Sequence, residues 1–259
     1  MSGFLFNDIV FGPVRSRRLG LSLGINLSPL HTKYCSFNCI YCECGWTPPS
    51  HPGKEELPSR ALVAEALEHS LRELVADGYL PDAITFAGNG EPTIHPEFSG
   101  VVDDTIRLRD QYVPAARVTV LSNGSRVNDP TVFQALLKLD NNIQKLDAGD
   151  DRLFRLINNP VDPVDLEQLV DGLSKFNGHV IIQSMFLKGE YRGIVVDNTT
   201  PEAISAWLEQ LKKIRPASVM VYPIARATPV HGIEKISPVI LEKIASMVRA
   251  EGIDVTVYE

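Results

Sequence analysis

The chain has 259 residues, with 25 Lys and Arg against 32 Asp and Glu, so its net charge is −7. Hydrophobic residues make up 44% and charged residues 22%, close to globular averages, which excludes disordered and fibrous proteins. A chain of this length buries enough surface to fold without disulfide bonds. Its four cysteines, Cys35, Cys39, Cys42 and Cys44, fall within ten residues. Such clustering excludes a disulfide framework and indicates a metal site.

The N-terminus carries no signal for export. It has no basic segment, and Asn7 and Asp8 interrupt its apolar residues. No apolar run approaches the roughly 20 residues that span a bilayer. We therefore expect a cytoplasmic protein without membrane contact, in which the thiols stay reduced.

Short apolar runs bounded by Gly, Asn or Pro alternate with longer amphipathic stretches along the chain. The runs predict strands at Ser22–Leu27, Ala83–Gly88, Arg117–Ser122, Ile143–Asp147, Val180–Leu187, Ser218–Pro223 and Asp254–Val257. The first amphipathic stretch predicts a helix over Ser59–Ala76, with an apolar face of Leu62, Ala66, Leu67, Leu71, Leu74 and Val75. Three more helices are predicted to open at Asp129-Pro130, Thr200-Pro201 and Ser237-Pro238, where proline suits the first turn.

The order of these elements predicts an α/β fold. Six β/α units in succession indicate a parallel sheet with right-handed crossovers. They are too few for a closed eight-stranded barrel, which leaves a three-quarter barrel or a doubly wound open sheet. Both architectures place functional residues at the carboxyl ends of the strands.

The first predicted strand leads into a loop with the spacing C-x3-C-x2-C, formed by Cys35, Cys39 and Cys42. Three thiolates this close can each bind one iron of a [4Fe–4S] cubane, which leaves the fourth iron open. The alternative is a structural zinc site that uses all four thiols, although zinc sites favour paired knuckles a dozen or more residues apart. On the cubane interpretation Cys44 is not a ligand, since a fourth thiolate would block the open iron.

This loop, placed after the first strand of a βα array, resembles the radical S-adenosylmethionine (SAM) superfamily. The resemblance implies a partial (β/α)6 barrel in one domain over residues 1–259, with a lead at 1–20, a cluster loop at 28–47 and a closing C-terminal strand. It implies an enzyme with one [4Fe–4S] cluster held by Cys35, Cys39 and Cys42, and SAM bound to the open iron. One electron then cleaves SAM to methionine and a 5′-deoxyadenosyl radical that abstracts hydrogen from a substrate.

The resemblance extends to residues that hold SAM at the ends of the next strands. Gly88-Asn89-Gly90-Glu91 is similar to the Gly-Gly-Glu motif, whose backbone and carboxylate bind the SAM amino group. Ser122 and Asn123 suit the SAM ribose or carboxylate, and we expect SAM contacts from Gln183 and from Tyr41, which precedes the last cysteine. Taken alone, these positions are typical of turns and strand ends.

Period-two alternation places Lys145 and Asp147 on one face of a strand, where two charges need pairing or a wet cavity. Either Lys145 pairs with Asp147 or Glu91, or the two residues form a wall that faces SAM or the substrate. We treat them as candidate catalytic residues. Lys188 is a weaker candidate for a contact. We expect Tyr222 to Arg226 to flank the adenine or substrate pocket, although a surface role for Arg226 stays open.

The segment from Phe11 to Asn26, with Lys145-Leu-Asp-Ala and Phe186-Leu-Lys-Gly, resembles the wyosine-type tRNA synthases, which enlarge a guanine base beside the anticodon. That resemblance implies a tRNA substrate and makes Lys145 and Lys188 Schiff-base candidates. No cysteine precedes Cys35 and there is no flavodoxin-like half. We therefore expect one cluster and an external electron donor of the flavodoxin or ferredoxin type.

The substrate class has three alternatives. A tRNA needs cations for its phosphates, and Arg15, Arg17 and Arg18 offer a patch, with Lys33 and Arg126 expected nearby. The same arginines can instead pair with the acidic residues. An acidic chain suits an activase or peptide-modifying enzyme that acts on a partner protein. A non-enzymatic electron carrier would have the cluster but no SAM pocket, which Glu91 and Asn123 speak against.

Overall fold

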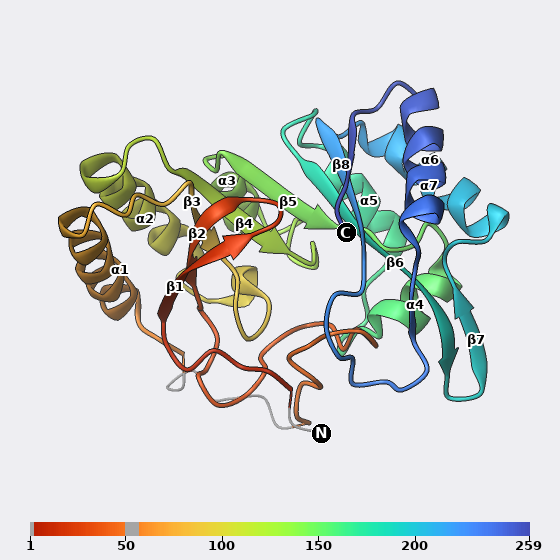
Figure 1. Cartoon of the computed structure of the whole chain (residues 1–259), viewed down its shortest axis with the longest axis horizontal. Helices are drawn as coiled ribbons and strands as arrows, with labels where there is room; N and C mark the ends of the chain where they lie inside the picture. Colours follow the sequence, from red (N-terminus) through yellow and green to blue (C-terminus); the bar gives the residue numbers. More distant parts are fainter. Residues whose placement is uncertain (1–2, 50–56) are drawn as a thin grey trace.

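The computed structural model describes residues 3–49 and 57–259, which form a sheet flanked by helices (Figure 1). The core of the sheet is a run of parallel strands: β2 (Gly20–Ile25), β3 (Ala83–Phe86), β4 (Arg117–Ser122), β5 (Asn141–Lys145), β6 (Ile181–Tyr191), β8 (Ser218–Pro223) and β10 (Val255–Val257). Neighbours in this sheet follow one another along the chain. A doubly wound sheet reverses its strand order, so the partial barrel is confirmed and the doubly wound alternative is wrong.

Three antiparallel strands extend this core. β1 (Val10–Ser16) pairs with β2, whereas β7 (Ile194–Asp197) and β9 (Glu234–Lys235) pair with the outer end of β6. No strand was predicted at β1, because Gly12 and Pro13 interrupt its apolar residues. Proline cannot donate to a sheet ladder, but it is tolerated at an edge, which is where β1 lies.

Seven α-helices and a short 3-10 helix follow the strands in the described residues. They are α1 (Arg60–Ala76), η2 (Pro92–Ile94), α2 (Phe98–Tyr112), α3 (Pro130–Leu136), α4 (Asp151–Asn158), α5 (Leu166–Ser174), α6 (Pro201–Ile214) and α7 (Pro238–Ala250). The predicted starts are confirmed. The side chains of Ser59, Asp129 and Thr200 accept hydrogen bonds from backbone N–H groups of the first turns, as N-caps do.

The buried face of α1 differs from the prediction. Val63, Leu67 and Leu71 are buried, whereas Leu62 and Val75 are 46% and 41% exposed. Residues four apart stack on one side of a helix, so the line from Val63 to Leu71 turns Leu62 towards solvent. The predicted face included Leu62 and Val75, whereas the buried face is centred on Val63, Leu67 and Leu71.

The two faces of the sheet have different environments. The outer face packs on helices, where Phe86 contacts Phe98 of α2 and Phe186 contacts Trp207 of α6. The inner face carries polar side chains, among them the hydrogen-bonded hydroxyls of Ser22 and Thr85. This polar inner face, together with the loops at the carboxyl ends of the strands, positions the candidate site.

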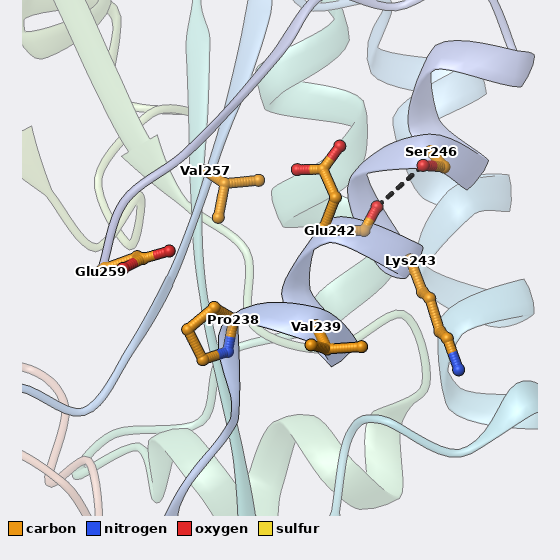
Figure 2. A pocket seen from close by; sticks show the side chains of 7 residues that line it. All are labelled: Pro238, Val239, Glu242, Lys243, Ser246, Val257 and Glu259. Carbon is orange, nitrogen blue, oxygen red and sulfur yellow. Dashed lines mark hydrogen bonds between the residues drawn. The ribbon is translucent and has the colours of Figure 1, made fainter.

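Two surface hollows lie away from those loops. The larger, of about 650 Å³, lies between α7 and β10 and is lined by Pro238, Val239, Glu242, Lys243, Ser246, Val257 and Glu259 (Figure 2). A second, of about 470 Å³, lies at the amino ends of β3, β4 and β5. Neither hollow includes a residue of the cysteine loop. No helix in the described part of the chain is long and apolar enough to cross a bilayer.

Trp207 packs α6 against the sheet, and its substitution tests this packing. Its indole N–H donates to the Leu146 carbonyl at 3.0 Å and to Ser184 Oγ at 3.1 Å, and its side chain is 1% exposed. We expect Trp207→Ala to lower the free energy of unfolding in urea by about 3–5 kcal/mol. The control Val239→Ala removes a 66% exposed side chain of α7 and leaves that free energy nearly unchanged. Equal effects of the two variants would contradict the packing described.

Candidate functional site

The cysteine loop follows β2 and is held against the carboxyl end of β3. The Tyr34 N–H donates to the Asn89 carbonyl, and the Glu91 N–H donates to the Tyr34 carbonyl, each at 3.0 Å. A Cβ atom on Gly90 would lie 1.7 Å from the Tyr34 carbonyl oxygen, so only glycine allows this approach. Here the glycine admits the loop itself, a packing role that the sequence did not predict.

Asn89 also serves this packing. Its side-chain amide exchanges hydrogen bonds with the backbone of Phe6, at 2.7 and 2.8 Å, and donates to the Pro29 carbonyl at 3.0 Å. Gly88 has a positive φ of 147°, and a Cβ there would meet the Asn26 side chain. Contact of SAM with the backbone of Gly88, Asn89 and Gly90 remains a prediction.

The sulfur atoms of two predicted ligands receive hydrogen bonds. Cys35 Sγ accepts from the Phe37 N–H at 3.4 Å and from Asn123 Nδ2 at 3.5 Å. Cys39 Sγ accepts from Lys145 Nζ at 2.9 Å and from Asn158 Nδ2 at 3.8 Å. Such donors stabilise thiolates, and hydrogen bonds to the sulfurs tune iron–sulfur clusters. The donor set therefore fits a cluster bound through these cysteines.

The remaining thiols, Cys42 and Cys44, form a pair. A hydrogen bond from Cys44 lowers the pKa of Cys42 to about 5, and the same bond raises the pKa of Cys44. Burial raises the pKa of Cys35 to about 12. Cys44 Sγ also donates to the Gly88 carbonyl at 3.6 Å. In the cluster-free chain these pKa shifts favour the thiolate at Cys42 and the protonated thiol at Cys44, which is also the donor to Gly88.

The described ranges contain no group of three His, Cys, Asp or Glu side chains placed to hold a single metal ion. A tetrahedral zinc site requires its ligands to converge on one point. The thiolates of a cubane bind different irons, so they surround a cluster rather than meet at one ion.

Asp147, two residues beyond β5, connects the loop to the sheet. Its side chain is fully buried, and its Oδ2 accepts from Tyr41 Oη at 2.5 Å and from Asn158 Nδ2 at 2.8 Å. Oδ2 also lies 2.9 Å from Lys145 Nζ, while Oδ1 accepts from the Met185 N–H of β6 at 2.8 Å. One carboxylate thus holds the cysteine loop, β5, α4 and β6 together.

Lys145 forms the predicted ion pair with Asp147 rather than with Glu91. Its Nζ also lies 4.5 Å from the centre of the Tyr41 ring. Burial lowers the pKa of Lys145, but Asp147 and Cys39 outweigh that effect and raise it. Lys145 therefore stays charged, directly beside a predicted cluster ligand.

Glu91 lies beside Asn123, just beyond the carboxyl ends of the neighbouring strands β3 and β4. Its Oε2 accepts from the Asn123 N–H at 2.6 Å, and its Oε1 accepts from the N–H and hydroxyl of Thr93 at 3.0 and 2.6 Å. Burial raises the pKa of this carboxyl, against the effect of these hydrogen bonds. Ser122 Oγ accepts from the Gly124 N–H, so its hydroxyl caps a turn. The SAM roles of Glu91, Ser122 and Asn123 stay predictions.

Gln183 pairs in register with Lys145 on the neighbouring strand, but its side chain serves another contact. Its Oε1 accepts from Arg18 Nη1 at 2.6 Å, and the Arg18 guanidinium lies 4.7 Å from the centre of the Tyr222 ring. Arg226 is exposed and pairs with Glu43 of the cysteine loop, and Lys188 pairs with Glu234 at 3.0 Å. Arg226 therefore has the surface role that the sequence left open.

The expected basic patch is not assembled as predicted. Lys33 is buried in the cysteine loop at the carboxyl end of the sheet, whereas Arg17 and Arg18 lie in the turn before the amino end of β2. Arg126 pairs with Asp129 at 2.6 Å. The sequence could not place Lys33, because its burial depends on how the loop closes. It gave no signal for Asn158, whose partner Cys39 is 119 residues away.

The Asp147 contacts predict a large loss of stability in Asp147→Asn. That change leaves the buried Lys145 charge without its carboxylate, at a cost of about 3–5 kcal/mol in the free energy of unfolding. Urea unfolding of the cluster-free protein measures it. The control Asp151→Asn breaks an exposed pair with Arg155 and leaves that free energy unchanged. A loss below about 1 kcal/mol in Asp147→Asn would contradict the role described.

The pKa differences predict selective alkylation of the cluster-free protein. The thiolate is the reactive form of cysteine, so at pH 7 Cys42 reacts with iodoacetamide while Cys35 stays protonated and slow. The rate at Cys42 falls as the pH falls through about 5. Mass spectrometry of the labelled peptides measures this order. Labelling of Cys35 as fast as that of Cys42 at pH 7 would contradict it.

Comparison with known proteins agrees with this geometry. The model of the radical SAM superfamily matches residues 30–197, from the cysteine loop to the end of β7. A radical SAM methyltransferase from Sphaerobacter thermophilus superposes with a TM-score of 0.66 at 15% identity, over 92% of this chain and 65% of that one. An archaeal TYW1 superposes with a TM-score of 0.51 at 12% identity, over 88% and 71%. At these identities the two likenesses show the fold alone.

Relatives by sequence include several UPF0026 proteins. One from Helicobacter pylori is 33% identical over 212 residues, which are 80% of this chain and 64% of that protein. One from Synechocystis sp. is 32% identical over 231 residues, which are 86% of this chain and 77% of that protein. The chain thus spans less than two thirds of the Helicobacter protein. With the match to the cysteine loop and barrel, these identities show that the chain belongs to the radical SAM superfamily and, within it, to the UPF0026 proteins.

Proposed function

We propose that the chain is a radical SAM enzyme whose site lies where the cysteine loop meets the carboxyl ends of β3, β4 and β5. Membership of the superfamily implies a [4Fe–4S] cluster and SAM. When bound, they supply a one-electron cleavage of SAM to methionine and a 5′-deoxyadenosyl radical. The observation that carries the proposal is the set of N–H donors on the sulfurs of Cys35 and Cys39.

In this proposal each residue has a distinct task. Cys35, Cys39 and Cys42 bind the cluster, while Cys44 stays a donor and leaves one iron open for SAM. Glu91 presents a carboxyl to the SAM amino group, held at one oxygen by the Asn123 N–H. Asp147 fixes Tyr41 and Lys145, so the wall beside Cys39 is rigid before any ligand binds.

The electron comes from a partner protein of the flavodoxin or ferredoxin type in this proposal. Cys35, Cys42 and Cys44 are partly exposed, which supports electron transfer from outside the chain. Because electron transfer needs only a transient contact, we expect a weak complex with a small interface.

For the substrate we propose a tRNA base first and a partner protein second. The exposed Arg15 and Arg17 form no ion pair with the described carboxylates, which supports contacts with phosphates. They lie towards the amino end of β2, so a tRNA would have to extend along the strands to bring a base to the site. The net charge of −7 supports the protein substrate instead, since it gives no long-range attraction for a polyanion.

Cysteine variants test the chemistry. Protein reconstituted without oxygen and reduced in the presence of SAM releases 5′-deoxyadenosine, measured by chromatography. We expect Cys35→Ala, Cys39→Ala and Cys42→Ala to lose the cluster and this product, because each iron then lacks its ligand. Cys44→Ala is the matched control and keeps both. Loss of the cluster in Cys44→Ala, or no product from wild type with full iron content, would contradict the proposal.

Nucleic-acid binding separates the two substrate classes. We expect wild type to bind tRNA with an affinity that falls as the salt concentration rises. In the double variant Arg15→Gln with Arg17→Gln, the slope of log affinity against log salt falls by about one phosphate contact for each arginine. Lys138→Gln, at a lysine paired with Asp103, is the control. No tRNA binding at low salt, with a partner protein co-purifying stoichiometrically, would favour the protein substrate.

A further inference from the structure

Lys33 is a buried cation that none of the roles above uses. It lies two residues before Cys35, is 3% exposed, and donates from Nζ to the Gly45 carbonyl at 2.9 Å. It forms no ion pair with a carboxylate of residues 3–49 and 57–259. An ammonium removed from water without a counter-charge is costly, so a partner of negative charge is needed.

The surroundings of Lys33 identify that partner. Burial lowers its pKa, but the thiols of Cys42, Cys35, Cys39 and Cys44 together outweigh burial and raise it. In turn Lys33 lowers the pKa of Cys35 and of Cys42. Gly45, which accepts from Lys33, donates its own N–H to the Cys42 carbonyl at 3.0 Å. The ammonium therefore lies inside the cysteine loop, against the turn that carries Cys42 and Cys44.

The comparison with Lys145 sharpens this assignment. Lys145 donates directly to the sulfur of Cys39, and Asp147 neutralises its charge at 2.9 Å. Lys33 has no such carboxylate in the described structure and adds a net positive charge to the loop. Three thiolates give an oxidised cubane a net negative charge, and an added electron makes it more negative. A fixed cation therefore stabilises the reduced cluster more than the oxidised one.

We propose that Lys33 is the counter-charge of the cluster, and that its ammonium favours cluster binding and one-electron reduction. This inference rests on the proposed function. The reductant is a low-potential one-electron donor protein, which is oxidised by one electron as the cluster gains it, with no bond broken in this step. Lys33 is a positioning residue, since it acts on the reaction through the charge of the cluster.

Four variants separate charge from shape. Lys33→Gln removes the charge and keeps an N–H donor, Lys33→Met removes both, and Lys33→Arg keeps the charge. Lys138→Met removes an exposed lysine charge, 44% exposed, and is the matched control. Each protein is reconstituted without oxygen, its iron is counted, and its midpoint potential is measured by redox titration followed by electron paramagnetic resonance (EPR).

We expect Lys33→Gln and Lys33→Met to accept the electron at least tenfold less favourably, a fall of about 59 mV in the potential for a one-electron couple. Lys33→Arg and Lys138→Met keep the wild-type potential. Folded Lys33→Gln that binds no cluster, beside Lys33→Arg that does, also supports the proposal, because Arg keeps the positive charge that Gln lacks.

Equal potentials and iron contents in wild type, Lys33→Gln and Lys33→Met would overturn the inference. Loss of the cluster from Lys33→Arg as well as from Lys33→Gln would also overturn it, since shape would then decide. In either of these outcomes the wild-type protein can still cleave SAM, so the proposed function would stand. Failure of the proposed function itself would appear as wild-type protein that holds iron and releases no 5′-deoxyadenosine.

Discussion

The buried carboxylate of Asp147 is the interaction on which the site depends. It lies beyond the end of β5 and bonds to the cysteine loop through Tyr41, to α4 through Asn158, and to β6 through the Met185 N–H. Its charge is compensated by Lys145 and by these donors, which makes its burial tolerable. Removing it would release three segments of the chain at once.

Charged side chains determine how the site around the cysteine loop is arranged. Two buried lysines, Lys33 and Lys145, lie at the cysteine loop, and they differ in what neutralises their charge. Lys145 is held in an ion pair, so its contribution at Cys39 is directional, a hydrogen bond to one sulfur. In the described structure Lys33 has only the Gly45 carbonyl as its hydrogen-bond partner, so it acts through its full charge. The chain thus provides both a hydrogen bond and a counter-charge for a negatively charged group at the loop.

Local signals in the sequence predicted much of the fold and the ligand set. The predicted features depend on residues that are close together in the chain, where the hydrophobic period and the residue types indicate the structure. They are the strand order, three N-caps and the spacing of Cys35, Cys39 and Cys42. The ion pair of Lys145 and Asp147 was among the alternatives, because both residues lie on one face of the strand predicted over Ile143–Asp147. Contacts between segments far apart in the chain could not be predicted from the sequence. Tyr41 meets Asp147 across 106 residues, and Lys33 is buried only because the loop closes around it.

The most direct test of the central claim, an open iron on a cluster held by three thiolates, is the EPR spectrum of the reduced protein with and without SAM. A ligand that binds the open iron changes its electronic environment, so the account predicts that SAM alters the spectrum of wild type and of Cys44→Ala alike. A fully loaded, reduced cluster whose spectrum is the same with and without saturating SAM would contradict it.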